Sequence, residues 1–567
     1  MLYPSNVDAG VKMGSPVWLS DMSLCLPKTA FSTDRRKYRW QLIDYEAEGV
    51  NGVMLSAGPE TDAPDVTYSP NLRGWYAVYV GIWGARLAEG EAHMVKVRLK
   101  DDPCFTVFTR EKPSLYTLEE GFWKYIDLTG RDIVIGQQKS GFPTSASLAY
   151  IRLVPLNEDE VIKVKKDWAD GDAKRLIAAN DAFSDFYQKR STTKEGILEM
   201  VEPYRNTDFK KIFWEVGYGE TTLYGSACGT IIGEGIEDFS RIGDRYAYES
   251  IQILKAKGIN PLKTAMEHAH SMDLEFHVSQ RVEQFCYAPP WETFFSTRFY
   301  AAHPELRLVD RDGTEVAGLS YAYPEVRRYY ISVLKEAAAC GADGAVVIYV
   351  RAPPIILYEK PLVDGFKESY GLDPRAVDER DDRWLRYRAG FITQFMRELR
   401  LAMDEVGEGL GRRLETSAIT LATGGENLFY GLDIDVWVKE RLIDNLIPYP
   451  CHADHSFEEI DMNYYRNVTG GSRCNLYPNV MPRRMPPEEF KKKALSYYDA
   501  GADGLFFWDT NARHDTTSIW ATVRRLGHIG ELKAWIIEGK REEEPRTMKV
   551  LKLGGYTMFK YSPYRGG

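Results

Sequence analysis

The stretch GADGLFFWDT at residues 501–510 decides the fold class of this chain. Its first four residues, Gly-Ala-Asp-Gly, occur a second time at 341–344, where they lead into the apolar run GAVVIYV (344–350). A glycine just past a helical pattern is a common helix stop, and a short apolar run bounded by turn residues is typical of a buried strand. The same helix–turn–strand unit repeated along the chain indicates a barrel built from such units.

Working outward from these two copies, we find eight apolar runs, each followed by an amphipathic helical pattern. The runs are RLIAAND (175–181), KIFWEVG (211–217), LEFHVSQ (274–280), GAVVIYV (344–350), RLETSAIT (413–420), DNLIPYP (444–450), RCNLYPN (473–479) and GLFFWDT (504–510). Continuous apolar strands that alternate with helices indicate a parallel sheet covered by helices. We therefore predict an α/β fold, a (β/α)₈ TIM barrel. An open doubly wound sheet is the alternative, although the glycine-rich turn expected after its first strand is missing.

The amino-terminal part has a different pattern. Runs such as WYAVYVGIW (75–83) and HMVKVRLK (93–100) alternate with a period of two, and turn residues separate them. We predict a β-sandwich over residues 1–160, similar to carbohydrate-binding modules, and a polar linker at 157–168. The barrel is expected over 161–540. Residues 541–567 are expected to add strands to the sandwich or to pack on the barrel.

Bulk properties exclude several functional classes. The net charge is −10 and no long basic run occurs, which makes nucleic acid and anionic membranes poor partners. The sequence contains no run of 18 apolar residues, so no membrane-spanning helix is predicted. The seven cysteines form no CxxC pair, so neither a disulfide framework nor a thiolate zinc site is indicated. Because residues 1–14 do not resemble a signal peptide, we expect a cytoplasmic protein, or an exported one if a leader has been removed.

In a barrel of this type, the active site lies where the strands end. Four carboxylates fall at these positions and are the candidate catalytic residues: Asp509, Glu359, Asp181 and Glu215. Glycoside cleavage requires two carboxyl groups that flank the scissile bond. For each of the four, a structural role as a helix cap or as the partner of a buried arginine is the alternative.

The same ends carry amides, arginines and aromatic rings, which suit the hydroxyl groups and apolar faces of sugars. The candidate substrate-binding residues are Asn180, Arg281, Glu283, Tyr349, Arg351, Trp291, Tyr477, Asn479 and Trp508. The alternative for the aromatic loop around Trp291 is a small satellite core or an oligomer contact. An oligo- or polysaccharide is thus the expected partner, and the oligomeric state stays open.

The histidines raise the alternative of a metal-dependent sugar isomerase or lyase. The run CHADH (451–455) follows the sixth predicted strand and offers ligand types that suit zinc. A single short cluster is weak evidence, however, and we expect neither a catalytic metal nor another cofactor.

Several motifs resemble the family-10-like glycosyl hydrolases. They are HPELRLVDRDG (303–313), VVIYVRAPP (346–354), YEKPLVDGFKESYGLDPR (358–375), DIDVWVKERLIDNLIPYP (433–450), LYPNVMPR (476–483) and GADGLFFWDT (501–510). The resemblance covers about 175–530 and implies a bacterial barrel glycosidase that acts on a poly- or oligosaccharide.

One departure from related retaining barrel glycosidases concerns the catalytic pair. Those enzymes carry the acid/base glutamate after strand 4 and the nucleophile at the end of strand 7, whereas this chain has Tyr349-Val350-Arg351 and Tyr477-Pro478-Asn479 there. We therefore predict Asp509 and Glu359 as the leading pair, with Asp181 and Glu215 as substitutes. A barrel that binds sugar without cleaving it is the alternative.

Overall fold

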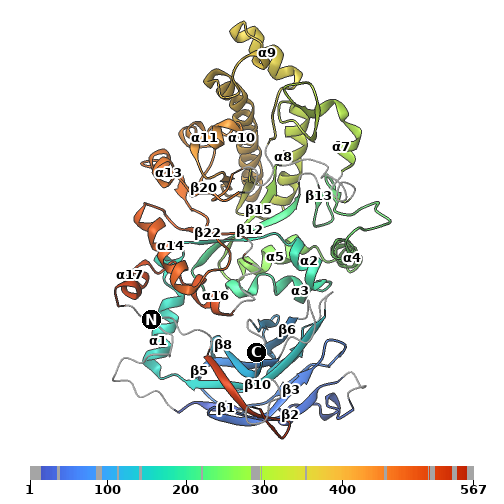
Figure 1. The fold of residues 1–567 in the computed structure, drawn as a ribbon, viewed down its shortest axis with the longest axis vertical. Coiled ribbons are helices and arrows are strands. Elements are labelled where there is room, and N and C mark those ends of the chain that lie inside the picture. The colour runs from blue at the N-terminus through green and yellow to red at the C-terminus, as the bar shows by residue number, and fades with distance from the viewer. Residues whose placement is uncertain are drawn as a thin grey trace, which may run out of the picture.

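The computed structural model describes residues 15–34, 39–84, 92–110, 114–138, 143–218, 221–282, 294, 297–350, 354–452, 456–508, 510, 517–538 and 546–558. Figure 1 shows a β-rich part at one end of the molecule and a larger helical and parallel-stranded part at the other. Among the described residues, each part has its own hydrophobic core.

Within the described ranges, the larger part contains a sheet of eight parallel strands. In chain order they are β11 (Leu176–Asn180), β12 (Phe209–Tyr218), β15 (Glu275–Arg281), β18 (Gly344–Ile348), β19 (Glu415–Thr420), β20 (Asn445–Pro448), β21 (Asn475–Leu476) and β22 (Leu505–Phe507). Every one of the eight predicted runs overlaps one of these strands. The strand order follows the chain from β11 to β21, and β22 pairs with β11.

The sheet closes on itself through the residues that follow β21. Asn479 forms a parallel bridge with Phe506 of β22, and the backbone N–H of Val480 donates to the Phe506 carbonyl at 2.9 Å. This closure excludes the open doubly wound sheet. Small and aromatic apolar side chains from alternating positions fill the interior, among them Ile177, Phe213 and Phe506.

Helices cover the outside of the barrel, as the predicted alternation requires (Figure 1). The described helices of the larger part are α2 (Phe183–Lys189), α3 (Lys194–Leu198), α4 (Ile242–Ala256), α5 (Pro261–His270), α7 (Arg298–Ala302), α8 (Pro324–Ala338), α9 (Lys360–Tyr370), α10 (Asp382–Leu410), α11 (Gly424–Phe429), α12 (Ile434–Lys439), α13 (Met462–Thr469), α14 (Pro487–Asp499), α16 (Thr517–Val523) and α17 (Ile529–Glu538), of which α9 lies at the tip of the molecule, away from the strands (Figure 1). A short 3₁₀ helix, η4 (Glu202–Tyr204), lies just before β12.

The two Gly-Ala-Asp-Gly copies form the same turn. In each copy the first glycine has a positive φ, +118° at Gly341 and +95° at Gly501. The aspartate carboxylate then accepts a backbone N–H of the preceding barrel strand: Asp343 from Phe276 at 2.7 Å, and Asp503 from Leu476 at 2.8 Å. The repeated tetrapeptide therefore fixes two strand starts by the same hydrogen bond, which is why it indicated the barrel.

The smaller part is built from mostly antiparallel strands. They are β1 (Val17–Leu19), β2 (Gln41–Ala47), β3 (Val50–Ala57), β4 (Val66–Tyr68), β5 (Trp75–Gly84), β6 (Ala92–Leu99), β7 (Thr106–Thr109), β8 (Ser114–Asp127), β9 (Ile133–Gln137), β10 (Thr144–Pro155), β23 (Arg546–Leu553) and β24 (Tyr556–Thr557). Strand β23 from the carboxyl-terminal end pairs with β2 and β8. Because β10 pairs with β5 and also, in parallel, with β6, the described strands form one continuous hydrogen-bonded network.

The predicted linker at 157–168 is wrong. This segment forms helix α1 (Glu158–Trp168), which opens with a reciprocal capping box between Asn157 and Glu160. The charged residues are good helix formers, and the helix carries the Trp168 ring to within 6.0 Å of the Trp75 ring on β5. The connection between the two parts is thus a packed helix.

Candidate functional site

Three residues predicted for the site meet at the carboxyl ends of neighbouring barrel strands. Arg281 of β15 donates from Nε to Glu215 Oε2 at 3.2 Å and from a terminal nitrogen to Glu215 Oε1 at 3.4 Å, on the adjacent strand β12. The guanidinium also lies over two rings, 4.7 Å from the Tyr218 ring centre and 5.6 Å from that of Trp508. Trp508 belongs to the cluster of side chains that fills the barrel interior. The pair is therefore an interior feature at the open end of the barrel.

Asp181 follows β11, the strand that lies between β12 and β22. Its carboxylate accepts the Ser184 backbone N–H at 3.1 Å and the Ser184 hydroxyl at 2.6 Å. The next residue, Ala182, is buried and has φ 51° and ψ −39°. The Phe183 N–H donates to the Asp181 carbonyl, which makes this a tight turn of a rare and strained kind. Backbone strain of this type concentrates at functional sites, so it supports a role for this strand end.

Asn479 lies beside Trp508 and is fully buried, with 0% of its surface exposed. Its Oδ1 accepts the Trp508 backbone N–H at 3.1 Å. Its Nδ2 has no hydrogen-bond partner among the described residues.

Two predicted site residues point toward the helices outside the barrel. Asn180 faces the helical layer, where its Oδ1 accepts the Ala182 N–H at 2.7 Å and its Nδ2 donates to the Met200 carbonyl. Tyr349 also points outward, and its hydroxyl lies 3.0 Å from the Met396 sulfur of α10. Strand side chains alternate between the two faces, so a residue one position away from an interior side chain packs against the helices.

Tyr477 points inward but lies toward the opposite end of the barrel. Its ring crowds Gly504, where an added Cβ would sit 2.5 Å from the ring. Burial raises the pKa of its hydroxyl to about 12, although the positive charge of Lys211 acts to lower it. Lys211 itself pairs with Glu415, the first residue of β19, and with Glu275, the first residue of β15, at 3.1 Å. Tyr477 therefore belongs to a polar layer at the amino ends of the strands.

The Glu359 carboxylate is an anchor of the loop before α9. It has 0% exposed surface, and it accepts the backbone N–H groups of Leu357 at 3.0 Å and Val309 at 3.1 Å. Burial raises the pKa of this carboxyl group, against the lowering effect of these hydrogen bonds. In this placement it does not reach a substrate, so the predicted catalytic role has no support from the structure.

Four predicted residues lie outside the described residues: Asp509, Glu283, Arg351 and Trp291. Their roles stay predictions. Asp509 directly follows Trp508 in the chain.

The histidine run after β20 contributes one residue to a mixed cluster at the carboxyl ends of the strands. His452 Nδ1 lies 2.7 Å from Glu426 Oε2 and 3.0 Å from Glu458 Oε2. Ligand atoms of these three residues lie within 4.8 Å of one another, so they could hold a divalent cation. Asp454 and His455 lie outside the described residues. The metal-dependent alternative thus rests on this cluster.

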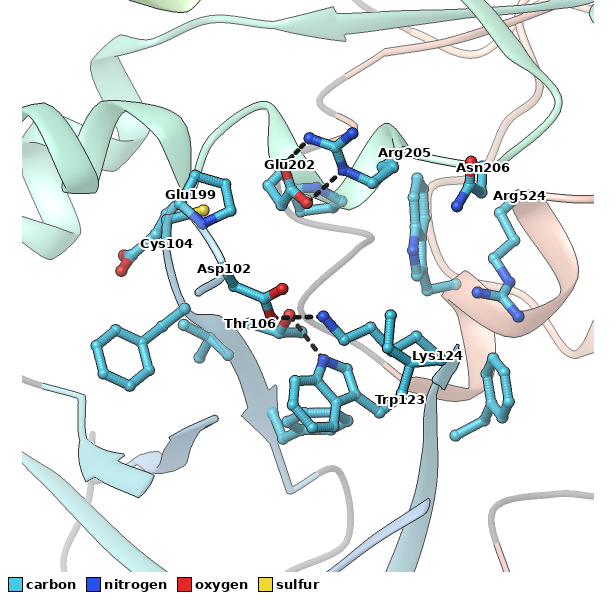
Figure 2. Close-up of a pocket in the computed structure, with 18 of the residues that line it drawn as sticks. Asp102, Cys104, Thr106, Trp123, Lys124, Glu199, Glu202, Arg205, Asn206 and Arg524 are labelled. Atoms are coloured by element: carbon cyan, nitrogen blue, oxygen red, sulfur yellow. Dashed lines mark hydrogen bonds and ion pairs between the residues drawn. The ribbon is translucent and has the colours of Figure 1, made fainter. Parts of the chain in front are cut away.

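A cavity of about 510 Å³ lies between the β-rich part and the barrel helices, and sequence reasoning missed it. Figure 2 shows Asp102, Thr106, Trp123 and Lys124 of the β-rich part facing residues of the barrel part, among them Glu202 and Arg524. The lining comes from segments around 101–108, 122–126, 199–206 and 520–525, far apart in the sequence. In the sequence, the feature that could have indicated this cavity is the largely aromatic run Phe122-Trp123-Lys124-Tyr125.

No protein-family model matches the chain, and no curated protein matches it either. The described part of the chain has no helix with the length and apolar character that crossing a membrane requires. The resemblance to the family-10-like glycosyl hydrolases therefore stays a prediction.

Among solved structures, the chain is similar to several carbohydrate-active enzymes. It shares 11% identity with the chitinase ChiW of Paenibacillus sp. str. FPU-7, covering 81% of this chain and 56% of that chain with a TM-score of 0.35. It shares 9% identity with a cycloisomaltooligosaccharide glucanotransferase of Paenibacillus sp., covering 78% of this chain and 53% of that chain with a TM-score of 0.34. It shares 12% identity with the maltogenic α-amylase AmyB of Thermotoga neapolitana, covering 63% of this chain and 76% of that chain with a TM-score of 0.33.

The chain thus spans about half the length of two of these three proteins. Likeness at this level of identity concerns the fold alone, and no residue role is carried over from it.

Proposed function

We propose that this chain hydrolyses glycosidic bonds of an oligo- or polysaccharide at the carboxyl ends of the barrel strands. The observation that carries the proposal is the Glu215–Arg281 pair, held between the rings of Tyr218 and Trp508, with the Asp181 carboxylate on the neighbouring strand. Two carboxyl groups and flat aromatic faces at the ends of neighbouring strands are the elements that glycoside cleavage requires.

The hydrogen bonds suggest how the roles divide. Arg281 stabilises the ionised form of Glu215, and the Ser184 N–H and hydroxyl do the same for Asp181. Ionised carboxylates serve as a nucleophile or a base, or they bind sugar hydroxyls. The general acid is then a third carboxyl group, and Asp509, next to Trp508 in the chain, is our candidate for it.

Reducing-end release from a broad panel of polysaccharides tests this function. We expect hydrolysis of at least one polymer by the native chain and a loss of at least a hundredfold in rate for Asp509→Asn and for Glu215→Gln. The matched control is Asp343→Asn, which changes a carboxylate at the opposite end of the barrel. Native rates in the Asp509→Asn and Glu215→Gln variants, with a folded protein, would refute the assigned roles.

A second function, sugar binding without cleavage, is favoured by one observation. Glu215 is only 2% exposed, and both of its oxygens already face Arg281. Calorimetry on the same panel separates the two functions: heat of binding with no product over long incubation supports a binding protein, whereas new reducing ends support the enzyme.

A further inference from the structure

The cavity between the two parts of the chain is separate from the open end of the barrel. Its barrel-side lining includes Glu202, Arg205 and Asn206, which come just before β12 begins at Phe209. The carboxyl end of the same strand carries Glu215 and Tyr218. In Figure 1, helices α3 and α16, which also line the cavity, lie between the barrel strands and the β-rich part. A ligand here would not contact the Glu215–Arg281 pair.

The size of the cavity suits a small molecule. Its volume of about 510 Å³ falls within the roughly 300–1,000 Å³ of ligand pockets. The β-rich part contributes one wall and the barrel helices contribute the other (Figure 2), so a bound molecule would contact both. Sites between two domains are a frequent location for ligands.

Most of the charged side chains that line the cavity are paired with an opposite charge, which argues for a neutral ligand. The pairs are Asp102–Lys124 at 2.5 Å, Glu202–Arg205 at 2.6 Å, Asp185–Lys189 at 2.9 Å, Asp167–Arg525 at 2.7 Å and Asp101–Arg131 at 3.5 Å. An anionic ligand would have to displace carboxylates from their partners, and a cationic ligand would displace guanidinium or ammonium groups.

Aromatic rings lie among these pairs. The Trp520 ring, on α16, stacks on Phe209 with a centroid distance of 5.5 Å, and it is half-buried at the cavity. Phe122 on β8 is also half-buried, and the Arg524 guanidinium lies 5.0 Å from its ring centre. Rings combined with groups that both donate and accept hydrogen bonds match a molecule with apolar faces and many hydroxyls.

Glu199 adds a group that can play both hydrogen-bonding roles. It lines the cavity, and burial raises the pKa of its carboxyl group to about 7, against the lowering effect of Lys96 and Lys189. Near neutral pH, its carboxyl group is therefore protonated in part of the molecules. A hydroxyl can donate to the ionised form and accept from the protonated form.

We propose that the cavity between the β-rich part and the barrel is a binding site for a neutral oligosaccharide, distinct from the site at the open end of the barrel. A sugar ring would stack on Phe122 or Trp520, and its hydroxyls would bind the Glu202–Arg205 and Asp102–Lys124 pairs. This inference does not rest on cleavage at the barrel end.

Isothermal titration of the full chain tests the site with maltoheptaose, cellohexaose, xylohexaose and chitohexaose, and with an oligogalacturonate as the anionic comparator. We expect at least one neutral oligosaccharide to bind, with affinity at least tenfold lower in Phe122→Ala. The matched control is Phe457→Ala, which removes a phenylalanine that is 59% exposed and does not line the cavity. Lys124→Met is the second variant, and it decides the test if Phe122→Ala does not fold.

The proposals for the two sites can be refuted independently. Glu215→Gln is expected to leave the cavity affinity within twofold, whatever it does to hydrolysis. Binding that Glu215→Gln abolishes and Phe122→Ala spares would overturn the cavity site while leaving the barrel site intact. Binding of the oligogalacturonate alone, or of no member of the panel, would also overturn it.

Discussion

The Arg281 guanidinium lies against the Glu215 carboxylate at 3.2 Å, and both side chains are almost completely buried at the carboxyl end of the barrel. Each charge is tolerated in this interior because the other neutralises it. Removing one partner leaves the other buried and unpaired, which costs about 3–5 kcal/mol.

We therefore expect Glu215→Ala to lower the free energy of unfolding by about 3–5 kcal/mol, measured by urea denaturation. The control is Glu325→Ala, because Glu325 forms an exposed pair with Arg328 whose loss is expected to cost less than about 1 kcal/mol. Equal effects of the two substitutions would show that the buried pair contributes no more than a surface pair.

The strained turn at Ala182 leads to a second prediction. Glycine adopts a positive φ without the steric cost that alanine meets, so Ala182→Gly should stabilise the fold or leave it unchanged, by up to about 1 kcal/mol. Ala179→Gly is the matched control in strand β11. Glycine there increases the backbone entropy that the chain loses on folding, and it should destabilise the fold by about 0.5–1 kcal/mol. Thermal unfolding of both variants measures the difference. A larger loss at Ala182 than at Ala179 would contradict the strain.

Glu359 provides a test of the anchoring role against the predicted catalytic one. Glu359→Ala removes the acceptor for the Leu357 and Val309 N–H groups and should destabilise by about 1–3 kcal/mol for each group left buried without a partner. Glu359→Gln keeps one acceptor oxygen, and it should retain turnover on any polymer that the native chain hydrolyses. A folded Glu359→Gln variant without activity would restore the catalytic role.

His528 is expected to make stability depend on pH. Burial opposes the charged imidazole, but hydrogen bonds to Asp167 and Asp208 outweigh it and raise the pKa to about 9. Since the unfolded pKa is about 6.5, the stabilisation is complete below pH 6.5 and is lost as the pH rises toward 9, on the order of 3 kcal/mol. The free energy of unfolding should fall across this range in the native chain.

His528→Gln is the control for that pH dependence, because it removes the titrating group. Its stability should change much less between pH 6.5 and 9, as measured by urea denaturation at each pH. A native chain whose stability is flat over this range would contradict the raised pKa.

Much of the fold was predictable because it depends on local pattern. Eight apolar runs gave eight strands, and the repeated Gly-Ala-Asp-Gly turn serves the same purpose at Asp343 and Asp503. The charged segment 157–168 was misread as a linker because charge alone does not distinguish a solvated helix from a loop. The β-rich part was predictable from its alternating runs, and the addition of strands from residues 541–567 was one of two predicted alternatives. The position of β23 between β2 and β8 was not predictable, since that pairing joins distant segments.

The candidate site shows the same division. The sequence alone determined which residues come at strand ends, and Glu215, Arg281 and Trp508 do meet there. Only the tertiary structure decided that Asn180 and Tyr349 face the helices, that Tyr477 lies at the far end and that Glu359 is an anchor. The physical reason is that side-chain direction depends on strand register and barrel closure, and that a cavity such as the one at Trp123 exists only where distant segments pack together.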